Sequence, residues 1–172
     1  MSPPLLIRLA VSTDVPVIAG MVRELARDGD CPEELLATQE DWLHDLFGTQ
    51  PPFTALVADL DNEVVGTLIY AVERYPGWAL PAIKVHELYV VPKLRRQGIA
   101  TTLFNFLADA VRGSPVVLMQ LTVRKANPAR KFYQRVGFQQ VPECLTYVMT
   151  LPALQALIET TGNFAGDIAG LL

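Results

Sequence analysis

Residues 86–100 constrain the fold of this chain more than any other segment. An apolar run stops at Pro92, a short turn follows that carries Arg95 and Arg96, and a helix starts at Gly98. The N-terminus of a helix leaves backbone N–H groups without intrahelical partners and carries a partial positive charge. The segment therefore predicts a strand–turn–helix unit whose turn is suited to a phosphate or pyrophosphate group.

The residues around the turn agree with this interpretation. Gly98 and Ala100 keep bulky side chains away from the backbone, and Thr101 and Thr102 add hydroxyl donors. The chain contains neither Gly-x-Gly-x-x-Gly nor Gly-Lys-Ser/Thr, so these two nucleotide-binding motifs are excluded. An ordinary strand–helix connection with solvated arginines remains the alternative at this point.

The composition predicts a folded domain. The chain has 172 residues, of which 51% are hydrophobic and 19% charged, so it is rich in core-forming residues and does not resemble a disordered chain. We expect one domain over residues 1–172, with 161–172 as a loose tail. The net charge is −4, so the chain as a whole does not attract nucleic acid or an anionic membrane, and neither is expected as a partner.

The cysteines and the apolar runs bear on metal binding and location. Cys31 and Cys144 form no close metal-ligand or redox spacing, and His44 and His86 add no cluster to them, so no metal is expected. No run approaches the roughly 18 apolar residues that span a bilayer, and the first residues lack the pattern of a signal peptide. A cytoplasmic location is the expectation.

The hydrophobic periodicity predicts the order β-α-α-β-β-β-α-β-α-β-β, a mixed α/β domain (α+β) with helices on both faces of a largely antiparallel sheet. Helices are expected at 14–27, 33–47, 98–111 and 127–137, with a small one after 151. Strands are expected at 5–11, 53–60, 64–72, 84–91, 116–123 (buried on both faces), 138–141 and 145–151. The third helix should bury Ile99, Leu103, Phe106, Leu107 and Ala110.

Two motifs carry a resemblance to a known family. Arg95-Arg96-Gln97-Gly98-Ile99-Ala100 resembles the Gln/Arg-x-x-Gly-x-Gly/Ala signature of GNAT superfamily N-acetyltransferases, in its strand–turn–helix context. Asn127-Pro128-Ala129-Arg130-Lys131-Phe132-Tyr133, followed by Val136-Gly137-Phe138, resembles the next motif of that superfamily. Together with the order of elements, the resemblance covers residues 5–150 and implies a GNAT fold.

A narrower resemblance is to the diamine and thialysine acetyltransferase branch. It rests on Ile7-Arg8 with Asp14, Glu24-Leu25-Ala26, Leu46-Phe47-Gly48, Tyr75 with Trp78, and Leu88-Tyr89-Val90. The chain departs from that branch where two adjacent acids are usual, because it has His86-Glu87 there. A further acid of the branch falls at Gly29, although Asp28 and Asp30 are its neighbours.

The resemblance implies direct transfer of an acetyl group from acetyl-CoA to a primary amine, in a ternary complex and without an acyl-enzyme. The implied acceptor is a small molecule: a diamine or polyamine, a lysine-like amino acid, or an amino sugar. A protein lysine or N-terminal acetyltransferase and a non-catalytic acyl-CoA sensor remain alternatives. A homodimer is also implied.

Three residues are candidates for proton transfer. The place of Tyr133 in the second motif implies the general acid that protonates the thiolate of CoA. His86 is the preferred base, since its unperturbed pKa of about 6.5 suits proton acceptance near neutrality. Glu87 points to the opposite face of an ideal strand, but it could still reach the site as amine ligand or base if the strand is bulged or splayed, as the resemblance implies.

The remaining candidates bind the two substrates. Trp78, Tyr75 and Asp28 are expected at the acceptor pocket, together with Glu87. Asn127 would hold the pantetheine arm, cap its helix, or do both. The full set expected to bind acetyl-CoA is Leu88 and Val90 (through their main chains), Arg95, Arg96, Gln97, Gly98, Ile99, Ala100, Thr101 and Asn127.

Overall fold

The computed structural model describes residues 4–29, 37–75, 79–144, 149, 152–153 and 155–156. The chain forms two compact units, Met1–Phe138 and Gln139–Leu172. The single domain expected over residues 1–172 stays a prediction, and the tail expected at 161–172 lies outside the described residues. In the described part of the chain, no helix has both the length and the apolar character needed to cross a bilayer.

The first unit is built on a five-stranded sheet in the order β1-β2-β3-β4-β5. Neighbouring strands are antiparallel except β4 and β5, which are parallel. The expected mixed, largely antiparallel sheet is therefore confirmed. The strands are β1 (Leu5–Leu9), β2 (Thr54–Leu60), β3 (Glu63–Tyr75), β4 (Leu80–Val90) and β5 (Met119–Leu121).

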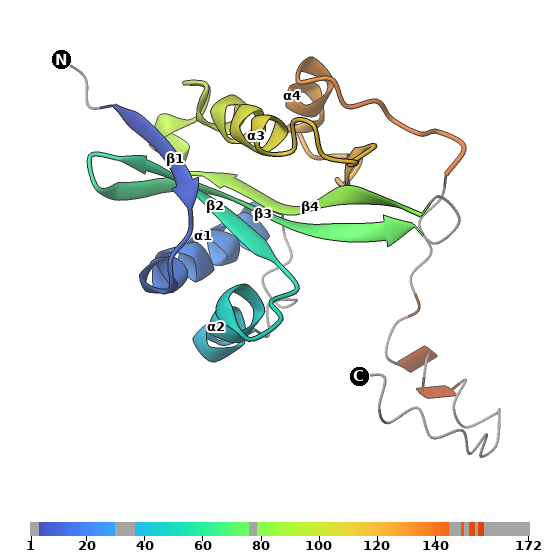
Figure 1. Cartoon of the computed structure of the whole chain (residues 1–172), viewed down its shortest axis with the longest axis horizontal. Coiled ribbons are helices and arrows are strands. Elements are labelled where there is room, and N and C mark those ends of the chain that lie inside the picture. The colour runs from blue at the N-terminus through green and yellow to red at the C-terminus, as the bar shows by residue number, and fades with distance from the viewer. Residues whose placement is uncertain are drawn as a thin grey trace. The chain divides into compact units, whose positions relative to one another are not determined.

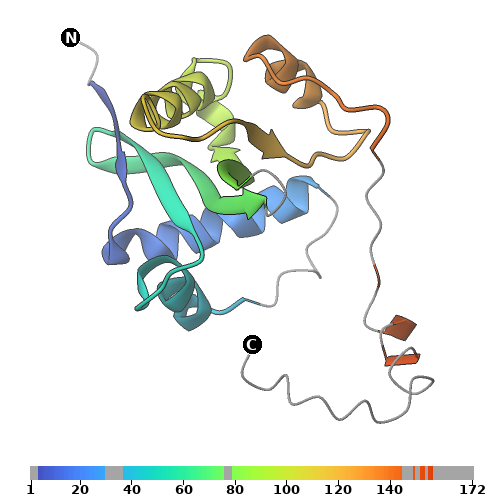
Figure 2. The ribbon, with the colours of Figure 1, turned by 45° about the vertical axis from the view of Figure 1, so that its right-hand side comes forward.

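Helices cover both faces of this sheet, as expected. Figure 1 shows α3 and α4 on one face and α1 and α2 on the other, and Figure 2 shows α1 and α2 side by side. The helices are α1 (Val15–Asp28), α2 (Gln39–Phe47), α3 (Ile99–Ala110) and α4 (Arg130–Arg135), with short 3-10 turns η1 (Ser12–Asp14) and η3 (Pro92–Leu94). Residues 33–36 of the expected second helix lie outside the described residues.

Local sequence signals set several of these boundaries. The β2–β3 hairpin turns at Asp61 and Asn62, which both have positive φ (58° and 63°), as a two-residue type I′ turn requires. Thr38 caps α2, because its hydroxyl accepts a hydrogen bond from the Asp41 N–H while the Asp41 carboxylate accepts one from the Thr38 N–H. Gly48 follows the last residue of α2.

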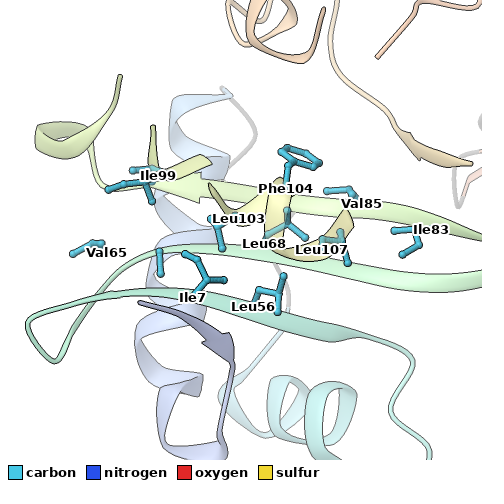
Figure 3. Packing of buried hydrophobic residues seen from close by; sticks show 12 residues of the cluster. Ile7, Leu56, Val65, Leu68, Ile83, Val85, Ile99, Leu103, Phe104 and Leu107 are labelled. Carbon is cyan, nitrogen blue, oxygen red and sulfur yellow. The ribbon is translucent and has the colours of Figure 1, made fainter. Parts of the chain in front are cut away.

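The core has one cluster on each face of the sheet. The cluster under α3 joins Leu56, Leu68 and Ile83 of the strands to Ile99, Leu103, Phe104 and Leu107 of the helix (Figure 3). The cluster under α1 and α2 joins Ile18, Val22 and Leu46 to Ala55, Val57 and Ile69. Phe106 and Ala110, which were expected on the buried face of α3, are exposed. The buried face instead includes Phe104, which lies next to Leu103 on the side that packs against the sheet.

Two of the strand predictions are wrong. Only Met119–Leu121 of the segment 116–123 is a strand, and it is half-buried rather than enclosed, because β4 is its one neighbour. Residues 138–141 form no strand. The Phe138 N–H instead donates to the Tyr133 carbonyl at 3.0 Å and so closes α4. The partner strand expected at 145–151 lies, apart from Met149, outside the described residues.

One ion-pair network ties the start of α1 to the edge of the sheet. Arg8 of β1 donates to both carboxylate oxygens of Asp14 (2.7 and 3.1 Å) and to Asp59 of β2. The Asp14 carboxylate also accepts from the Val11 N–H at 2.8 Å. Asp14 is 7% exposed, and the Arg8 guanidinium lowers the pKa of its carboxyl group. The network therefore fixes the angle at which the chain leaves β1 and enters α1.

We predict that Asp14→Ala destabilises the fold by about 2–4 kcal/mol, because it removes a buried partner of Arg8 and leaves the Val11 N–H without its acceptor. Urea unfolding at pH 7 measures the change. The matched control is Asp109→Ala, which removes an exposed partner of Arg112 and should change stability by about 0.5 kcal/mol or less. Because pairing lowers the pKa of Asp14, the difference should shrink as the pH falls through that lowered pKa. Equal effects of the two changes would contradict the assigned role.

Candidate active site at the open edge of β4

The parallel strands β4 and β5 pair over only three of the eleven residues of β4. Ile83, Lys84 and Val85 pair with Met119, Gln120 and Leu121, and the strand pairing ends there. β4 continues for five further residues, to Val90. Within the described part of the chain, the edge of β4 that faced β5 has no strand partner beyond Val85. The sheet is therefore open at this point.

A β-bulge lies at the place where β5 leaves. On the β3 side, Tyr70 pairs with Val85 and Ile69 pairs with Glu87, so His86 is an extra residue in β4. The bulge brings the two candidate bases to one face. His86 contacts Phe53, and Glu87 is opposite Ile69, and both partners belong to the cluster under α1 and α2. The distortion of the strand that Glu87 needs in order to reach the site is therefore present.

Glu87 is a half-buried carboxyl group. Desolvation raises its pKa from 4.5 to about 7, and no other group contributes to this shift. Among the residues that the structure describes, none donates a hydrogen bond or forms an ion pair with its carboxylate. A carboxyl group with a pKa of about 7 is close to half protonated at neutral pH, so it is able either to accept or to give a proton there.

His86 has a different environment. Its side chain is exposed, and its ring stacks edge-on against Phe53 with the ring centroids 4.9 Å apart. Its pKa is lowered, first by desolvation and then by the charge of Lys84, against a smaller opposite effect of Glu73. The imidazole is therefore neutral at pH 7, and its flat face forms part of the surface beside Glu87.

Tyr133 is held in place by the C-terminal turn of α4 and by neighbouring aromatic rings. At the C-terminal end, the Gly137 N–H donates to Gln134 and the Phe138 N–H to Tyr133, which is a Schellman motif with Gly137 at φ 106°. The ring packs edge-on against Phe104 and Phe138. Desolvation raises the pKa of the Tyr133 hydroxyl, and the charge of Glu87 raises it further. The phenol thus stays protonated at neutral pH, and it lies close enough to Glu87 to respond to its charge.

The main chain of β4 offers hydrogen-bonding groups at the open edge. The Val91 N–H donates to Val65 of β3 at 3.0 Å, so the alternation of the strand turns the N–H and C=O groups of Leu88 and Val90 toward the side that β5 has left. The Val90 carbonyl already accepts from Arg95 Nε at 2.9 Å. The N–H of Val90 and both groups of Leu88 face the opening, and their binding of acetyl-CoA stays a prediction.

The open edge leads directly into the start of α3. Arg96 and Gly98 both have positive φ (64° and 87°), and the first helical hydrogen bond runs from the Thr102 N–H to the Gly98 carbonyl. The N–H groups before that bond have no intrahelical acceptor. The space around Gly98 is open, since a Cβ there would meet no atom within 4 Å. Gln97, Thr101 and Arg96 are exposed around this turn, whereas Ile99 is buried in the core.

Arg95 and Asp28, expected to bind different substrates, form an ion pair. Arg95 Nη2 donates to Asp28 Oδ2 at 2.7 Å, and the guanidinium lies 5.3 Å from the centroid of the Tyr89 ring. With its bond to Val90, Arg95 connects the end of α1, the end of β4 and the turn before α3. The pair therefore orders the walls of the opening, and it could not be predicted from the sequence because 67 residues separate the two partners.

Three further residues predicted from the sequence to bind substrate are Asn127, Trp78 and Tyr75, and only Asn127 has a described side chain. The Asn127 side chain accepts from the Ala129 N–H at 2.8 Å, but α4 begins only at Arg130 with Ala129 at its N-cap position, so Asn127 is not the N-cap that the sequence predicted and orders the turn before the helix instead. Trp78 lies outside the described residues, as does the side chain of Tyr75 at the end of β3. Phe53 is a site residue that sequence reasoning missed. It precedes β2 as an ordinary apolar residue, and only the fold brings it to His86.

Comparison with known proteins identifies the family. Residues 19–138 match the acetyltransferase (GNAT) family, and the chain belongs to it. A curated relative is the thialysine N-epsilon-acetyltransferase of Mus musculus, 28% identical over 145 residues, which are 80% of this chain and 85% of the relative. The corresponding enzyme of Bos taurus is 27% identical over 147 residues, 80% and 86% of the two chains.

Solved structures share the fold. An integron cassette protein from the mobile metagenome of V. cholerae superposes with a TM-score of 0.73 at 22% identity, over 91% of this chain and 98% of that one. The aminoglycoside N-acetyltransferase AAC(6')-Iy, solved in complex with CoA, gives a TM-score of 0.69 at 16% identity, over 86% and 96%. The chain is thus an N-acetyltransferase, and enzymes of its family take the acetyl group from acetyl-CoA.

The half-buried Glu87 should make the stability of the fold depend on pH. Its pKa is raised from 4.5 to about 7, so well below pH 4.5 the group is neutral in both folded and unfolded chains, and above pH 7 folding must bury its charge. We predict that Glu87→Gln changes stability by less than about 0.5 kcal/mol at pH 4.5 and increases it by up to about 3 kcal/mol at pH 8.5. Denaturant unfolding at the two pH values measures this, with Glu63→Gln in the exposed β2–β3 hairpin as control. A Glu87→Gln protein that is no more stable at pH 8.5 would show that the carboxyl group is not desolvated.

Proposed function

We propose that this enzyme transfers an acetyl group directly from acetyl-CoA to the primary amine of a small molecule, with both substrates bound at once. The observation that carries the proposal is the half-open strand β4, where a half-buried carboxyl group with a pKa of about 7 lies near a neutral phenol. Proton acceptor, proton donor and a hydrogen-bonding edge therefore meet in one opening. In this scheme Glu87 and Tyr133 transfer protons and neither attacks the acetyl group, so no acyl-enzyme is formed.

The elements around the opening fit the parts of acetyl-CoA. The pantetheine arm carries amide groups, and the edge of β4 at Leu88 and Val90 offers the main-chain partners that such groups need. The start of α3 offers N–H groups, a positive dipole and the exposed Arg96 for the pyrophosphate. Acetyl-CoA supplies a thioester, from which the acetyl group passes to the amine while CoA leaves as its thiol.

Glu87 is the proposed general base. An alkylamine with a pKa near 10.4 is mostly protonated at pH 7, so a proton must be removed before the nitrogen can attack. A carboxylate whose pKa has been raised to about 7 is a far better acceptor than an ordinary glutamate. His86, the base preferred from the sequence, has its pKa lowered and is exposed, so its proposed role is to line the acceptor site.

Tyr133 is the proposed general acid. The thiolate of CoA is the leaving group, and it needs a proton before it departs as a thiol. Burial and the nearby Glu87 keep the phenol protonated, and the Schellman motif with its aromatic neighbours fixes the ring. The hydroxyl of Tyr133 is therefore able to deliver a proton at the end of the opening that faces α4.

Arg95 and Asp28 have a structural role in the proposal. Their ion pair holds the turn before α3 against the end of α1, so Arg96 rather than Arg95 is the proposed charge partner of the phosphates. Asn127 shapes the entry into α4. Trp78 and Tyr75 stay predicted residues of the acceptor pocket.

The relatives support a small amine as acceptor. The curated relatives are named for thialysine, and a protein of the same fold is named for aminoglycosides, and both kinds of compound carry primary amines. A cytoplasmic homodimer stays a prediction from the family resemblance.

The pH dependence of turnover tests the base. With acetyl-CoA and an accepted amine, kcat measured by free-thiol release should rise with pH through about 7, because Glu87 must be ionised. Glu87→Gln should lower kcat about 10²- to 10⁴-fold and remove that rise. His86→Asn is the matched comparison and should keep the rise. The assignment is wrong if the rise disappears in His86→Asn and persists in Glu87→Gln. CoA binding without thiol release from any amine would instead favour a sensor.

Replacing the phenol tests the acid. Tyr133→Phe keeps the ring among Phe104 and Phe138 and removes only the hydroxyl, so acetyl-CoA binding should change little. We predict a decrease in kcat of about 10²-fold or more, since the departing thiolate loses its proton donor. Titration calorimetry with acetyl-CoA and steady-state kinetics separate the two quantities. Phe132→Leu, which changes the same cluster without touching a hydroxyl, is the control for packing. An unchanged kcat in Tyr133→Phe would exclude the phenol as the acid.

A further inference from the structure

A pocket opens at the end of α2, beside the first residues of β2. Its volume is about 200 Å³, and its walls come from α2, from β2 and from the chain at the end of β1. The Ala10 N–H donates to the Ala55 carbonyl at 2.9 Å, so two small residues are neighbours in the wall and leave the space open. We call this space the apolar pocket, and its main lining residues are Leu9, Ala10, Leu46, Phe47, Phe53 and Ala55.

The apolar pocket offers no charge to a ligand. None of the described residues that line it is charged, and its polar lining residue, Thr54, is paired with the Tyr70 hydroxyl by a hydrogen bond. Leu9 and Phe47 are 58% and 38% exposed, so apolar side chains also reach solvent at the pocket. A charged group that entered would lose its hydration and gain no partner among these residues.

The apolar pocket lies on the same face of the sheet as Glu87. Ala55 pairs with Ile69, and Ile69 pairs with Glu87, so the three residues form one row across β2, β3 and β4. Ala55 and Ile69 both belong to the cluster under α1 and α2. Because neighbouring strands are about 4.8 Å apart, the Cα atoms of Ala55 and Glu87 are separated by roughly 10 Å.

Phe53 connects the apolar pocket with the acceptor site. It lines the pocket, and the centroid of its ring lies 4.9 Å from that of His86, the neighbour of Glu87. The position of Phe53 is fixed from α2, because its N–H donates to the Asp45 carbonyl at 3.2 Å. The phenyl ring and the neutral imidazole therefore form an apolar surface between Glu87 and the pocket.

The size of the apolar pocket indicates which group it can hold. Apolar cavities of about 150 Å³ bind benzene. A pocket of about 200 Å³ is therefore large enough for a phenyl ring or a branched alkyl group. Burial of a group of this size strengthens binding about ten- to a hundredfold.

We infer that the apolar pocket binds an uncharged, apolar group of the acceptor, so that the substrate class is a primary amine with an aromatic or branched alkyl group at its far end. The amine of this substrate meets Glu87, its alkyl chain lies along His86 and Phe53, and its apolar group fills the pocket beside Phe47. This inference rests on the proposed function and deepens it.

The apolar pocket discriminates against acceptors whose far end is charged. A diamine carries a second ammonium group there, a lysine-like amino acid carries an ammonium and a carboxylate, and an amino sugar carries several polar groups. Each of these would lose water in the pocket without a charged partner among the described lining residues. The inference therefore gives this chain an acceptor different from the thialysine in the names of its curated relatives.

Matched amines test the inference in the full chain. 4-Phenylbutylamine carries the apolar group, n-butylamine is the same molecule without the ring, and cadaverine and L-lysine have a charged far end. Free-thiol release with acetyl-CoA should give a kcat/KM for 4-phenylbutylamine at least tenfold above that for each of the other three. The difference should lie in KM, because the ring binds far from the reacting nitrogen.

Substitutions in the pocket assign the preference to it. Ala10→Leu fills the pocket from a half-buried position and should lower the preference for 4-phenylbutylamine over n-butylamine about tenfold. Phe47→Ala removes a partly exposed wall and should lower the same preference by a smaller factor. Ala110→Leu, the same change as the first on the exposed surface of α3, is the matched control and should keep the preference. Thermal unfolding checks that each variant is folded.

The kinetic outcomes separate this inference from the proposed function. Equal kcat/KM values for 4-phenylbutylamine and n-butylamine would overturn the inference and leave the acetyltransferase proposal intact. A preference for cadaverine or L-lysine would overturn it in favour of an acceptor with a charged end. No thiol release with any amine, S-(2-aminoethyl)-L-cysteine included, would overturn both.

The variants distinguish the acceptor from other occupants of the pocket. A preference that persists in both Ala10→Leu and Phe47→Ala would show that the ring binds elsewhere, and the inference would then be wrong. Light scattering of the same variants measures their oligomeric state. A dimer that dissociates in these variants while the preference is unchanged would show that a second copy of the chain covers the pocket instead of the substrate.

Discussion

The parting of β5 from β4 after Val85 is the constraint on which the rest of the site depends. A strand inside a sheet has both edges occupied, so it has no main-chain groups to offer a substrate. Because β5 leaves, the half of β4 at Leu88 and Val90 has a free edge that runs directly into the start of α3. The bulge at His86 accompanies the parting and turns Glu87 to the face where an acceptor can reach it.

The site lowers the stability of the fold, and contacts elsewhere in the domain stabilise it. Burial of Glu87 disfavours its charged form, and an open strand edge lacks the hydrogen bonds of a continued sheet. At the opening, Arg95 joins α1, β4 and the turn before α3, and at the opposite edge of the sheet Arg8 joins β1, β2 and the start of α1. Both arginines connect segments that are distant in the sequence. Of these two networks, the one of Arg95 lies at the opening, whereas the carboxyl group of Glu87 has no ion pair within the described structure.

Local patterns predicted the elements better than their pairing. The motif at 95–100 and the Asn127–Gly137 helix could be located from the sequence, since capping, glycine conformations and helical spacing are local properties. The bulge at His86 could not, because it depends on the register between β3 and β4. The pairing of Arg95 with Asp28 and the contact of Phe53 with His86 are equally non-local. In the proposed function, these three features favour Glu87 over His86 as the base and give Arg95 and Asp28 a structural role.

The electrostatic link between Glu87 and Tyr133 gives the proposed reaction an order in time. While Glu87 is ionised, its negative charge holds the phenol proton in place, so the donor is not lost before an amine arrives. Once the amine has passed its proton to Glu87, that charge is gone and the phenol becomes a stronger acid. This change comes at the moment when the sulfur of CoA has to be protonated. The two groups therefore behave as one relay, in which filling the first position releases the second.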